Sequence, residues 1–359
     1  MHSRLDIFDV KIGTYRSFIH GGDIYRHDVK YDFSVNLNPL GMPENVRKKL
    51  IEAISCADRY PDILNENLTT KTAKMLSISK EQICFGNGAS ELIMAICHIL
   101  LPDSVMLVAP GFSGYKSAVS SAVPDCRIYC HYLKEENDFD LTKDFLDDLK
   151  ICEPKLIFLT TPNNPNGRLI DEVLLKQILE TCDEIGAVVV VDECFLSLTG
   201  KDEELSLITE VDKRKKLIVL RAFTKTYAIA GVRLGYSVGS REMIKKIKAH
   251  LPEWNISVFA QMAGAECLKN SQYVASSAEY IKRERKYLSD GLKKAGFKVF
   301  SSDANYILFR CRYDLSVRLL ERGILIRDCA DYEGLSTGFY RVAVRSHEEN
   351  EYLLSVLSK

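Results

Sequence analysis

The chain lacks an excess of charge of either sign. Its 359 residues carry 48 Lys and Arg against 49 Asp and Glu, which gives a formal net charge of −1. Without a long-range field of one sign, the composition does not favour nucleic acid or an anionic membrane as a partner. We therefore expect the function to reside in a local site that binds a small molecule.

Paired cysteine motifs are also missing. The eleven cysteines are an odd number, they are scattered along the chain, and none forms a C-x-x-C pair. Such cysteines in a chain of this length fit a reducing compartment better than a disulfide-rich secreted scaffold. Cys126, Cys130 and His131 lie close together, but no second pair of ligands accompanies them. The sequence thus predicts a cytoplasmic protein without a metal site.

Long apolar runs are absent as well. No run approaches 18 residues, and residues 1–13 mix charges with apolar side chains, so we expect neither a membrane span nor a signal peptide. Internal repeats and low-complexity segments are not found either. A length of 359 residues exceeds the usual size of one domain, which predicts two domains.

What the chain does contain, from about residue 68, is an alternation of short apolar runs with segments of helical periodicity. The runs expected to be strands are Ile83–Phe85, Val105–Ala109, Leu156–Leu159, Val188–Val191, Leu217–Leu220 and Leu234–Val238. Helices are expected at 89–101, 114–122, 141–150, 171–185 and 239–251. This alternation predicts an α/β fold with a mostly parallel sheet between helices, whose ligands bind at the carboxyl ends of the strands.

The pattern changes after Trp254. A long helical region is expected at 257–295, followed by strands at Tyr306–Arg310, Ile324–Arg327 and Tyr340–Val344 and by helices at 314–322 and 347–358. We predict an N-terminal arm (1–40) that joins a small α+β domain (253–359), with a large domain (41–252) between them.

The most informative stretch follows the apolar run Leu217–Leu220. Thr224, Lys225 and Arg233 occur within a dozen residues, at the end of a predicted strand. A lysine kept away from bulk water loses proton affinity and becomes a usable amine nucleophile. Thr224 and Arg233 are spaced to reach one phosphate group. An ordinary surface lysine is the alternative explanation for this stretch taken alone.

Three further motifs follow other predicted strands. Gly88-Ala89-Ser90 opens a helix, where free amides and the helix dipole favour an anion. Asp192 ends a buried strand, and Asn164 lies in an Asn-Pro turn. A helix cap, a tight turn and, for Phe112, a core aromatic residue are the ordinary explanations of each one separately. Only the combination is specific.

This combination resembles the pyridoxal-phosphate-dependent enzymes of the aspartate aminotransferase fold type (fold type I), over nearly the whole chain. The resemblance implies that the mostly parallel sheet of the large domain is mixed. The resemblance implies that Lys225 binds the cofactor covalently and that Asp192 pairs with its ring nitrogen. It also implies that Phe112 stacks on the ring and that Asn164 bonds its phenolic oxygen. The cofactor phosphate would be held by Gly88, Ala89, Ser90, Thr224 and Arg233, together with Tyr60 of a neighbouring subunit. A homodimer with shared active sites is therefore expected.

Other segments narrow the resemblance to the histidinol-phosphate aminotransferase branch and, within it, to the threonine-phosphate decarboxylases of cobalamin biosynthesis. These segments are His20–Gly22, Asp32–Gly41, Arg59–Asp62, Pro110–Phe112, Arg327–Leu335 and Tyr340–Ser346. The substrate-facing residues implied are His20, Gly21, Asn36, Asn164, Arg327 and Arg341. Aminotransferases of this branch usually carry a tyrosine at the position of Phe195, whereas the decarboxylase pattern has phenylalanine.

The resemblance thus implies decarboxylation of O-phospho-L-threonine to (R)-1-amino-2-propanol O-2-phosphate and CO2. The bond at Cα that is broken is the one held perpendicular to the cofactor ring, and the motifs alone do not show which bond that is. A histidinol-phosphate-type aminotransferase therefore remains the main alternative. A phosphoserine decarboxylase is also open, because one methyl group changes binding by only about 1–3 kcal/mol. A non-catalytic module that kept the fold is disfavoured by the presence of Lys225 and Asp192.

Overall fold

A seven-stranded mixed sheet forms the centre of the computed structural model, which describes residues 21–358. Its strands stand in the order β2 (Ile83–Gly86), β8 (Gly235–Gly239), β7 (Leu217–Ala222), β6 (Val188–Asp192), β5 (Leu156–Thr160), β3 (Ser104–Ala109) and β4 (Arg127–Tyr132). The strands from β7 to β4 pair in parallel, whereas β8 runs antiparallel to both β2 and β7. The predicted mostly parallel sheet is confirmed.

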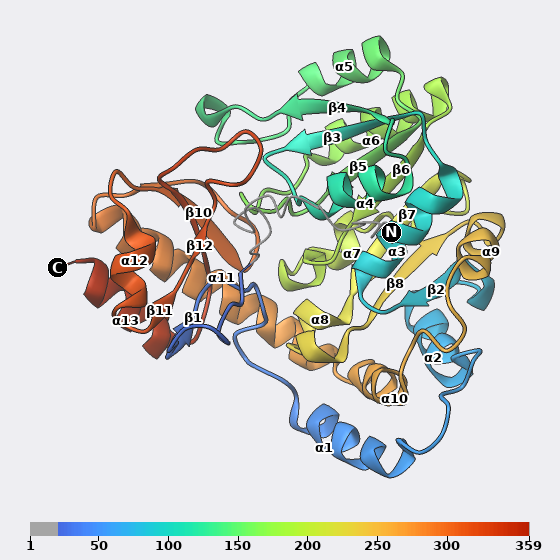
Figure 1. Ribbon diagram of the computed structural model, residues 1–359, viewed down its shortest axis with the longest axis horizontal. Coiled ribbons are helices and arrows are strands. Elements are labelled where there is room, and N and C mark those ends of the chain that lie inside the picture. Colours follow the sequence, from blue (N-terminus) through green and yellow to red (C-terminus); the bar gives the residue numbers. More distant parts are fainter. Residues whose placement is uncertain (1–20, 359) are drawn as a thin grey trace, which may run out of the picture.

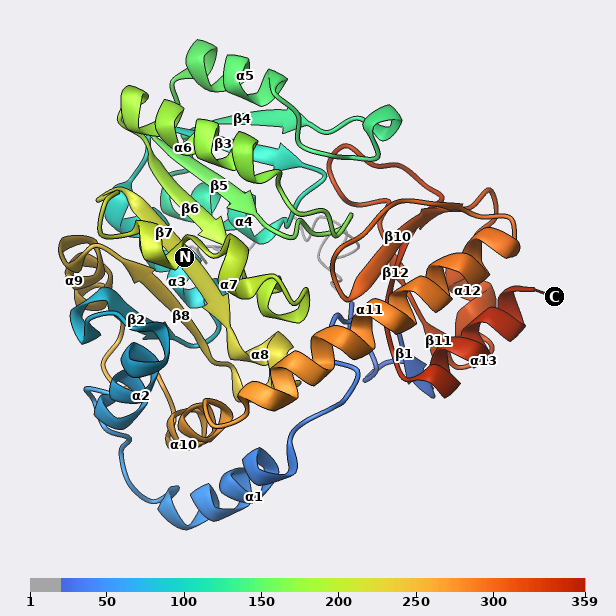
Figure 2. The ribbon, with the colours of Figure 1, turned by 180° about the vertical axis from the view of Figure 1, so that it is seen from behind.

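Helices cover both faces of this sheet because its strands are apolar on both sides. Along β6, Val189 and Val191 face one cluster of buried side chains, while Val188 and Val190 face another. The helices that contribute to the first cluster include α1 (Glu44–Ala53), α2 (Glu66–Leu76), α5 (Asp144–Cys152), α6 (Glu172–Ile185) and α10 (Val258–Cys267). Those that contribute to the second cluster include α3 (Ala89–Leu100), α4 (Gly114–Ala122) and α9 (Arg241–Ala249). Figures 1 and 2 show this layered arrangement from opposite sides.

A second sheet has four antiparallel strands and lies beside the first (Figure 1). Its order is β12 (Arg327–Asp328), β13 (Phe339–Ala343), β10 (Tyr306–Arg310) and β9 (Lys298–Val299). The helices α11 (Ser271–Lys294), α12 (Leu315–Leu320) and α13 (His347–Leu357) accompany it. The short strand β1 (Tyr31–Asp32) pairs in parallel with β11 (Ile324–Leu325), so the beginning of the described chain lies against its C-terminal part.

Short helices complete the connections. Two single-turn α-helices, α7 (Asp202–Leu205) and α8 (Phe223–Thr226), follow β6 and β7. The 3-10 helices are η2 (Ile54–Cys56), η3 (Lys80–Gln82), η4 (Glu135–Asn137), η5 (Leu196–Leu198), η6 (Leu207–Glu210) and η7 (Ala230–Val232). Because α8 begins directly after β7, it holds the residues Phe223–Thr226 at the carboxyl end of that strand.

Two predicted elements are divided in the structure. The helical region expected at 257–295 breaks between α10 and α11, where the Asn270 side chain donates hydrogen bonds to the carbonyls of Glu266 and Cys267. An asparagine side chain that bonds nearby backbone groups competes with the helix ladder in this way. The strand expected at Ile324–Arg327 becomes β11 and β12, which pair with different strands.

No helix within residues 21–358 combines the length and apolar character needed to cross a membrane. The helix α10 packs against α1 and α2, and α11 packs against α13. The division of the chain at residues 40 and 252 into an arm and two domains stays a prediction.

Candidate active site

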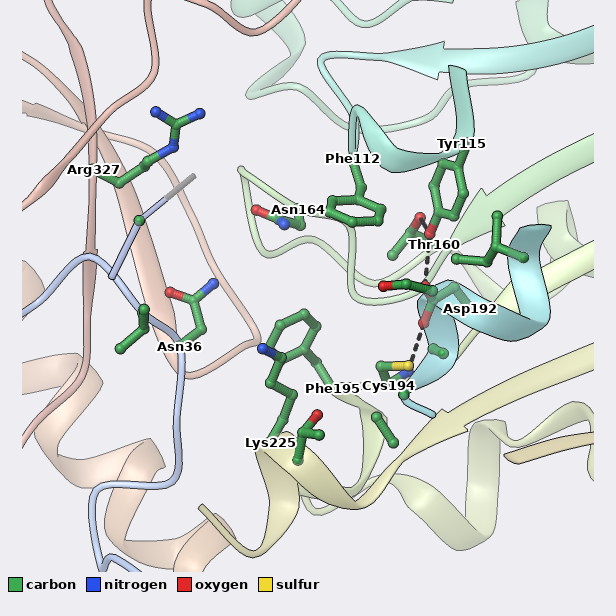
Figure 3. Close-up of a pocket in the computed structure, with 18 of the residues that line it drawn as sticks. Asn36, Phe112, Tyr115, Thr160, Asn164, Asp192, Cys194, Phe195, Lys225 and Arg327 are labelled. Atoms are coloured by element: carbon green, nitrogen blue, oxygen red, sulfur yellow. Dashed lines mark hydrogen bonds between the residues drawn. The ribbon is translucent and has the colours of Figure 1, made fainter. Parts of the chain in front are cut away.

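The chemically active side chains converge on one cavity of about 370 Å³, at the carboxyl ends of β5, β6 and β7 (Figure 3). The residues that line it are Gly21, Ser34, Val35, Asn36, Gly88, Ala89, Ser90, Ile93, Phe112, Tyr115, Thr160, Asn164, Asp192, Cys194, Phe195, Ala222, Thr224, Lys225, Arg233, Arg327, Tyr332 and Arg341. They come from both sheets and from the segment after residue 20. Among residues 21–358, all the predicted site residues line this cavity except Tyr60.

His20 lies outside the described residues. Tyr60 is 80% exposed, and its ring lies 4.8 Å from that of Trp254, with the two planes inclined by 36°. Within this chain Tyr60 therefore contacts the surface around Trp254 and not the cavity, and its assignment to a neighbouring subunit's site stays a prediction.

Lys225 lies on α8, and its side chain points into the cavity (Figure 3). The Asn38 amide donates to the Lys225 carbonyl at 3.2 Å, and the Asn38 side chain donates to the Thr226 carbonyl at 2.8 Å. Burial lowers the pKa of the Lys225 amine below its ordinary value of 10.5, and the charges of Arg341 and Arg233 lower it further. These effects outweigh the opposing influence of Cys194 and Asp192. The amine is thus more often neutral, and nucleophilic, than an exposed lysine.

Asp192 ends β6, and its carboxylate is fixed by two donors, drawn as dashed lines in Figure 3. The Tyr115 hydroxyl donates to Oδ2 at 2.8 Å, and the Cys194 amide donates to Oδ1 at 3.0 Å. Tyr115 is itself held, because its ring stacks on Phe158 with centroids 4.7 Å apart and its hydroxyl lies 2.8 Å from that of Thr160. A carboxylate held in this way keeps its position when a positively charged group binds beside it.

One end of the cavity has the features of an anion site. Gly88 precedes α3 with φ of +75°, and the first residues of the helix, Ala89 and Ser90, line the cavity. Amides at a helix N-terminus attract an anion through their free N–H groups and the helix dipole. The Arg233 guanidinium approaches Gly88 so closely that a Cβ on that residue would overlap it. Thr224 lines the same cavity. These groups can hold a phosphate.

The opposite wall carries two arginines from the small sheet. Arg327 on β12 and Arg341 on β13 are directly opposed partners in the antiparallel pair. Arg327 donates to both carboxylate oxygens of Asp331, at 2.8 and 2.7 Å. Arg341, which is only 5% exposed, donates to the Asn164 side chain, to the Ser34 carbonyl at 2.7 Å and to the Tyr332 hydroxyl at 3.3 Å.

These contacts leave one positive charge uncompensated. None of the partners of Arg341 within residues 21–358 is a carboxylate, and its Nε atom is buried without a hydrogen bond. The nearby Asn36 Oδ1 atom is also buried without a partner in this part of the chain. A buried charge is normally paired, so this wall is built to receive an anionic group from outside the chain.

Sequence reasoning assigned no role to four residues of the site: Tyr115, Thr160, Cys194 and Tyr332. Tyr115 and Phe112 are three residues apart, and their rings meet edge to face at 5.3 Å. That spacing was a usable signal, since positions three apart at the start of a helix lie on one face. The Tyr332 contact with Arg341 joins a loop to a strand and had no comparable signal.

Cys126, Cys130 and His131 were not expected to bind a metal ion. His131 on β4 lies 2.6 Å from an Asp148 carboxylate oxygen through Nδ1. Among residues 21–358, no group of three or more His, Cys, Asp or Glu side chains is arranged to hold a metal ion.

The chain is similar to known proteins over most of its length. Residues 28–357 match the family "Aminotransferase class I and II". A threonine-phosphate decarboxylase from Salmonella typhimurium is 35% identical, with 94% of this chain and 95% of that protein covered. A histidinol-phosphate aminotransferase from Caldanaerobacter subterraneus is 32% identical, with 91% and 92% covered. The crystal structure of the histidinol-phosphate aminotransferase from Clostridium acetobutylicum has a TM-score of 0.83 and 32% identity, and covers 91% of this chain and 98% of its own.

The fold and the arrangement of the cavity agree with these similarities. The mixed seven-stranded sheet between helices is the fold predicted from the strand-end motifs. An amine nucleophile, a fixed carboxylate and an anion site surround one cavity, as a pyridoxal-phosphate enzyme requires. The chain belongs to the aminotransferase class I and II family and is a pyridoxal-phosphate-dependent enzyme.

Proposed function

We propose that this enzyme decarboxylates O-phospho-L-threonine, within cobalamin biosynthesis. The bond between Cα and the carboxylate carbon breaks, the carboxylate leaves as CO2, and a proton takes its place at Cα. The product is (R)-1-amino-2-propanol O-2-phosphate. Similarity to the Salmonella threonine-phosphate decarboxylase supports this assignment.

The observation that carries the proposal is the opposed pair Arg327 and Arg341. The substrate has two anionic groups, a carboxylate and a phosphate, and an arginine fork recognises either of them well. Arg341 has only neutral partners within the described chain, so it is ready for one anion. Arg327 is held by Asp331, which a substrate anion can replace. Asn36, Gly21 and, by resemblance, His20 complete this substrate side.

The residues on the other side of the cavity fit the cofactor. Gly88, Ala89, Ser90, Thr224 and Arg233 would hold its phosphate, while Phe112 and Asn164 would contact its ring. When bound, pyridoxal phosphate supplies an electron sink for the pair of electrons left by the broken bond.

Two side chains of this protein then carry the chemistry. Lys225 presents an amine whose pKa is lowered by burial for covalent attachment of the cofactor, and its Nζ afterwards delivers the proton to Cα. The Asp192 carboxylate, oriented by Tyr115 and the Cys194 amide, stabilises a positive charge on the ring nitrogen.

The second candidate is a histidinol-phosphate-type aminotransferase, which the two aminotransferase similarities favour. The Phe195 side chain weighs against it. Phe195 lines the cavity and meets the Tyr306 ring edge to face at 5.1 Å, so no hydroxyl from this position reaches a bound ring. The expected tyrosine of aminotransferases in this branch is absent here.

We further propose a cytoplasmic homodimer. All eleven cysteines are free thiols, which supports a reducing compartment. Tyr60 is exposed and thus accessible to a second copy of the chain, in which it would reach the cofactor phosphate.

The test is to incubate the cofactor-loaded enzyme with O-phospho-L-threonine in the absence of any 2-oxo acid, and to measure CO2 and aminopropanol phosphate. Release of both, lost in Lys225→Ala, is the expected result. O-phosphoserine, which lacks the methyl group of phosphothreonine, serves as the second substrate. The ratio of CO2 release from the two substrates measures how strongly the pocket selects for that methyl group. If CO2 is absent and histidinol phosphate instead converts the bound cofactor to its amine form, the protein is an aminotransferase and the proposal fails.

A further inference from the structure

A second cavity, of about 570 Å³, lies beside the active site. Its lining residues come mainly from α2, α7, α8, η6 and the beginning of α11. The helices α2, α7, α8 and α11 are labelled in Figure 2. Cys194 and Ala222 line both cavities, so one thin wall separates them. None of the catalytic roles proposed above uses the second cavity.

Its innermost polar groups satisfy one another. Arg221 is 5% exposed and forms ion pairs with Glu193 at 2.7 Å and with Asp202 at 2.5 Å. Glu193 is fully buried and also accepts hydrogen bonds from the Ser206 hydroxyl and the Leu207 amide. This network needs no ligand and fixes the floor of the cavity.

The carboxylates of the cavity outnumber its cations. Glu203 and Glu204, on α7, line the cavity in addition to Glu193 and Asp202, whereas Arg221 is the single basic residue among the lining residues. Neither Glu203 nor Glu204 has an ion-pair or hydrogen-bond partner within residues 21–358. With four carboxylates against one guanidinium, the cavity attracts a cation and repels an anion.

Two largely buried tyrosine side chains point to a ligand independently. Tyr227 and Tyr236 line the cavity and are 8% and 6% exposed. The Phe223 ring lies within 6 Å of both tyrosine rings, with centroid distances of 5.8 and 5.6 Å. Neither hydroxyl has a hydrogen-bond partner in the described chain, so both are free to pair with a group that enters the cavity. Burial raises the pKa of both phenols, so both remain donors at neutral pH.

The remaining wall is apolar. It is formed by side chains of α2, η6 and α11 and the residue after α10: Met75, Leu76, Ile208, Leu268, Val274, Ala275 and Ala278. An occupant must therefore combine an apolar body with a positive charge and a group that pairs with a phenol. Aromatic rings next to carboxylates also suit an ammonium group, which is attracted to a ring face.

We propose that this second cavity is a binding site for a small organic cation with an apolar body and a hydroxyl group. The charge lies toward Glu203 and Glu204, and the hydroxyl pairs with Tyr227 or Tyr236. The site is separate from the one that binds the phosphorylated substrate, whose negative charge the carboxylates repel.

Choline and its neutral isostere 3,3-dimethylbutan-1-ol are suitable probes, since they share shape and hydroxyl and differ in charge. Choline carries no N–H and cannot condense with the cofactor aldehyde. Calorimetric titration of the cofactor-loaded enzyme should give saturable binding of choline, one per chain, and at least about tenfold weaker binding of the isostere. A crystal structure with choline should place it between α7 and α11.

Variants localise the binding. The double variant Glu203→Gln, Glu204→Gln should weaken choline about threefold to tenfold, because exposed charges are each worth a fraction of a tenfold change. The double variant Tyr227→Phe, Tyr236→Phe should weaken it about fivefold by removing the hydrogen bond to the choline hydroxyl, whichever tyrosine makes it. Glu180→Gln, an exposed glutamate on α6 that does not line the cavity, is the matched control and should change nothing. Absence of binding, equal affinity for the isostere, or binding that ignores these variants would overturn the proposal.

Discussion

The Tyr115 hydroxyl donates a hydrogen bond of 2.8 Å to Oδ2 of Asp192, and the two residues are 77 positions apart in the sequence. Tyr115 lies in the first turn of the helix α4 and Asp192 ends the strand β6. The bond joins the helix that follows β3 to the carboxylate that faces the cofactor site. Tyr115 is therefore a positioning residue, which acts on the chemistry through Asp192.

The variant Tyr115→Phe removes this donor and keeps the ring that stacks on Phe158. A hydrogen bond to a charged group contributes about 1.5–3 kcal/mol, so we expect kcat/KM to fall at least about tenfold. Retention of pyridoxal phosphate should weaken in parallel, which fluorescence titration of the apoenzyme measures. Tyr313→Phe, at a tyrosine that is 72% exposed, is the control. An unchanged kcat/KM in Tyr115→Phe would show that the Cys194 amide alone orients Asp192.

The lowered pKa of Lys225 should make cofactor uptake depend on pH. Burial lowers the pKa of its amine below 10.5, and the positive charges of Arg341 and Arg233 act in the same direction. The rate at which apoenzyme takes up pyridoxal phosphate should rise with pH and reach its midpoint below 10.5. Arg341→Gln removes one repulsive charge and should move that midpoint upward, while Arg345→Gln, outside the cavity, should leave it in place. A midpoint that stays fixed in Arg341→Gln contradicts this explanation.

The lowered pKa of Lys225 also makes the free energy of unfolding depend on pH. The folded apoenzyme binds the Lys225 proton more weakly than the unfolded chain does, so between the folded-state pKa and 10.5 the unfolded state carries more protons. The free energy of unfolding should therefore increase with pH across this window. In Lys225→Met that part of the pH dependence should disappear, as urea unfolding of the apoenzyme at several pH values can test.

Local patterns predicted the central sheet because its strands are short, apolar and buried on both sides. Val188–Asp192, for example, is buried at every position and was recognised to within one residue. Strand order and direction are set by pairing between distant segments, which explains why a mixed sheet was predicted without identifying β8 as its antiparallel strand. A helix break at Asn270 depends on one side chain that a periodic pattern does not register.

The same reasoning applies to the candidate site. Residues at strand ends, such as Asp192 and Lys225, were predicted because the topology of parallel sheets brings strand ends together. Their partners could not be predicted in that way. The Asn38 amide reaches the Lys225 carbonyl, and the Ser34 carbonyl accepts from Arg341, across 187 and 307 positions of the chain. Such contacts follow from the docking of the N-terminal segment and carry no local signature.

Gly88 offers a test of the phosphate-binding end of the cavity, with a matched control. Gly88 and Gly41 have nearly equal φ values of +75° and +74°, so alanine at either position strains the backbone, and at Gly88 the ψ of 166° adds to that strain. A Cβ at Gly88 would overlap the Arg233 guanidinium, whereas nothing lies within 4 Å of a Cβ at Gly41. Gly88→Ala should therefore weaken cofactor binding at least about tenfold, and Gly41→Ala should not. Equal cofactor affinities in the two variants would mean that Arg233 does not bind the phosphate.

Asp331 provides a test of the substrate side in which activity is expected to improve. Its carboxylate accepts two hydrogen bonds from Arg327 and thus competes with a substrate anion for that guanidinium. The pair is partly exposed, with 33% of the Asp331 side chain accessible, so its contribution is about 0.2–1 kcal/mol. In Asp331→Asn the competing charge is gone, and KM for O-phospho-L-threonine should fall about twofold to fivefold.

The control for this prediction is Asp328→Asn, because the Asp328 carboxylate lies in the same segment but accepts from the Ala330 amide and forms no ion pair with Arg327 within residues 21–358. KM should change less there than in Asp331→Asn. The decisive alternative is that Asp331 holds Arg327 in the position needed for the substrate. In that case Asp331→Asn raises KM, because Asp331 holds the Arg327 guanidinium beside Arg341 and stays bonded to it when the substrate binds. Because the two explanations predict opposite signs, steady-state kinetics with one variant and one control separates them.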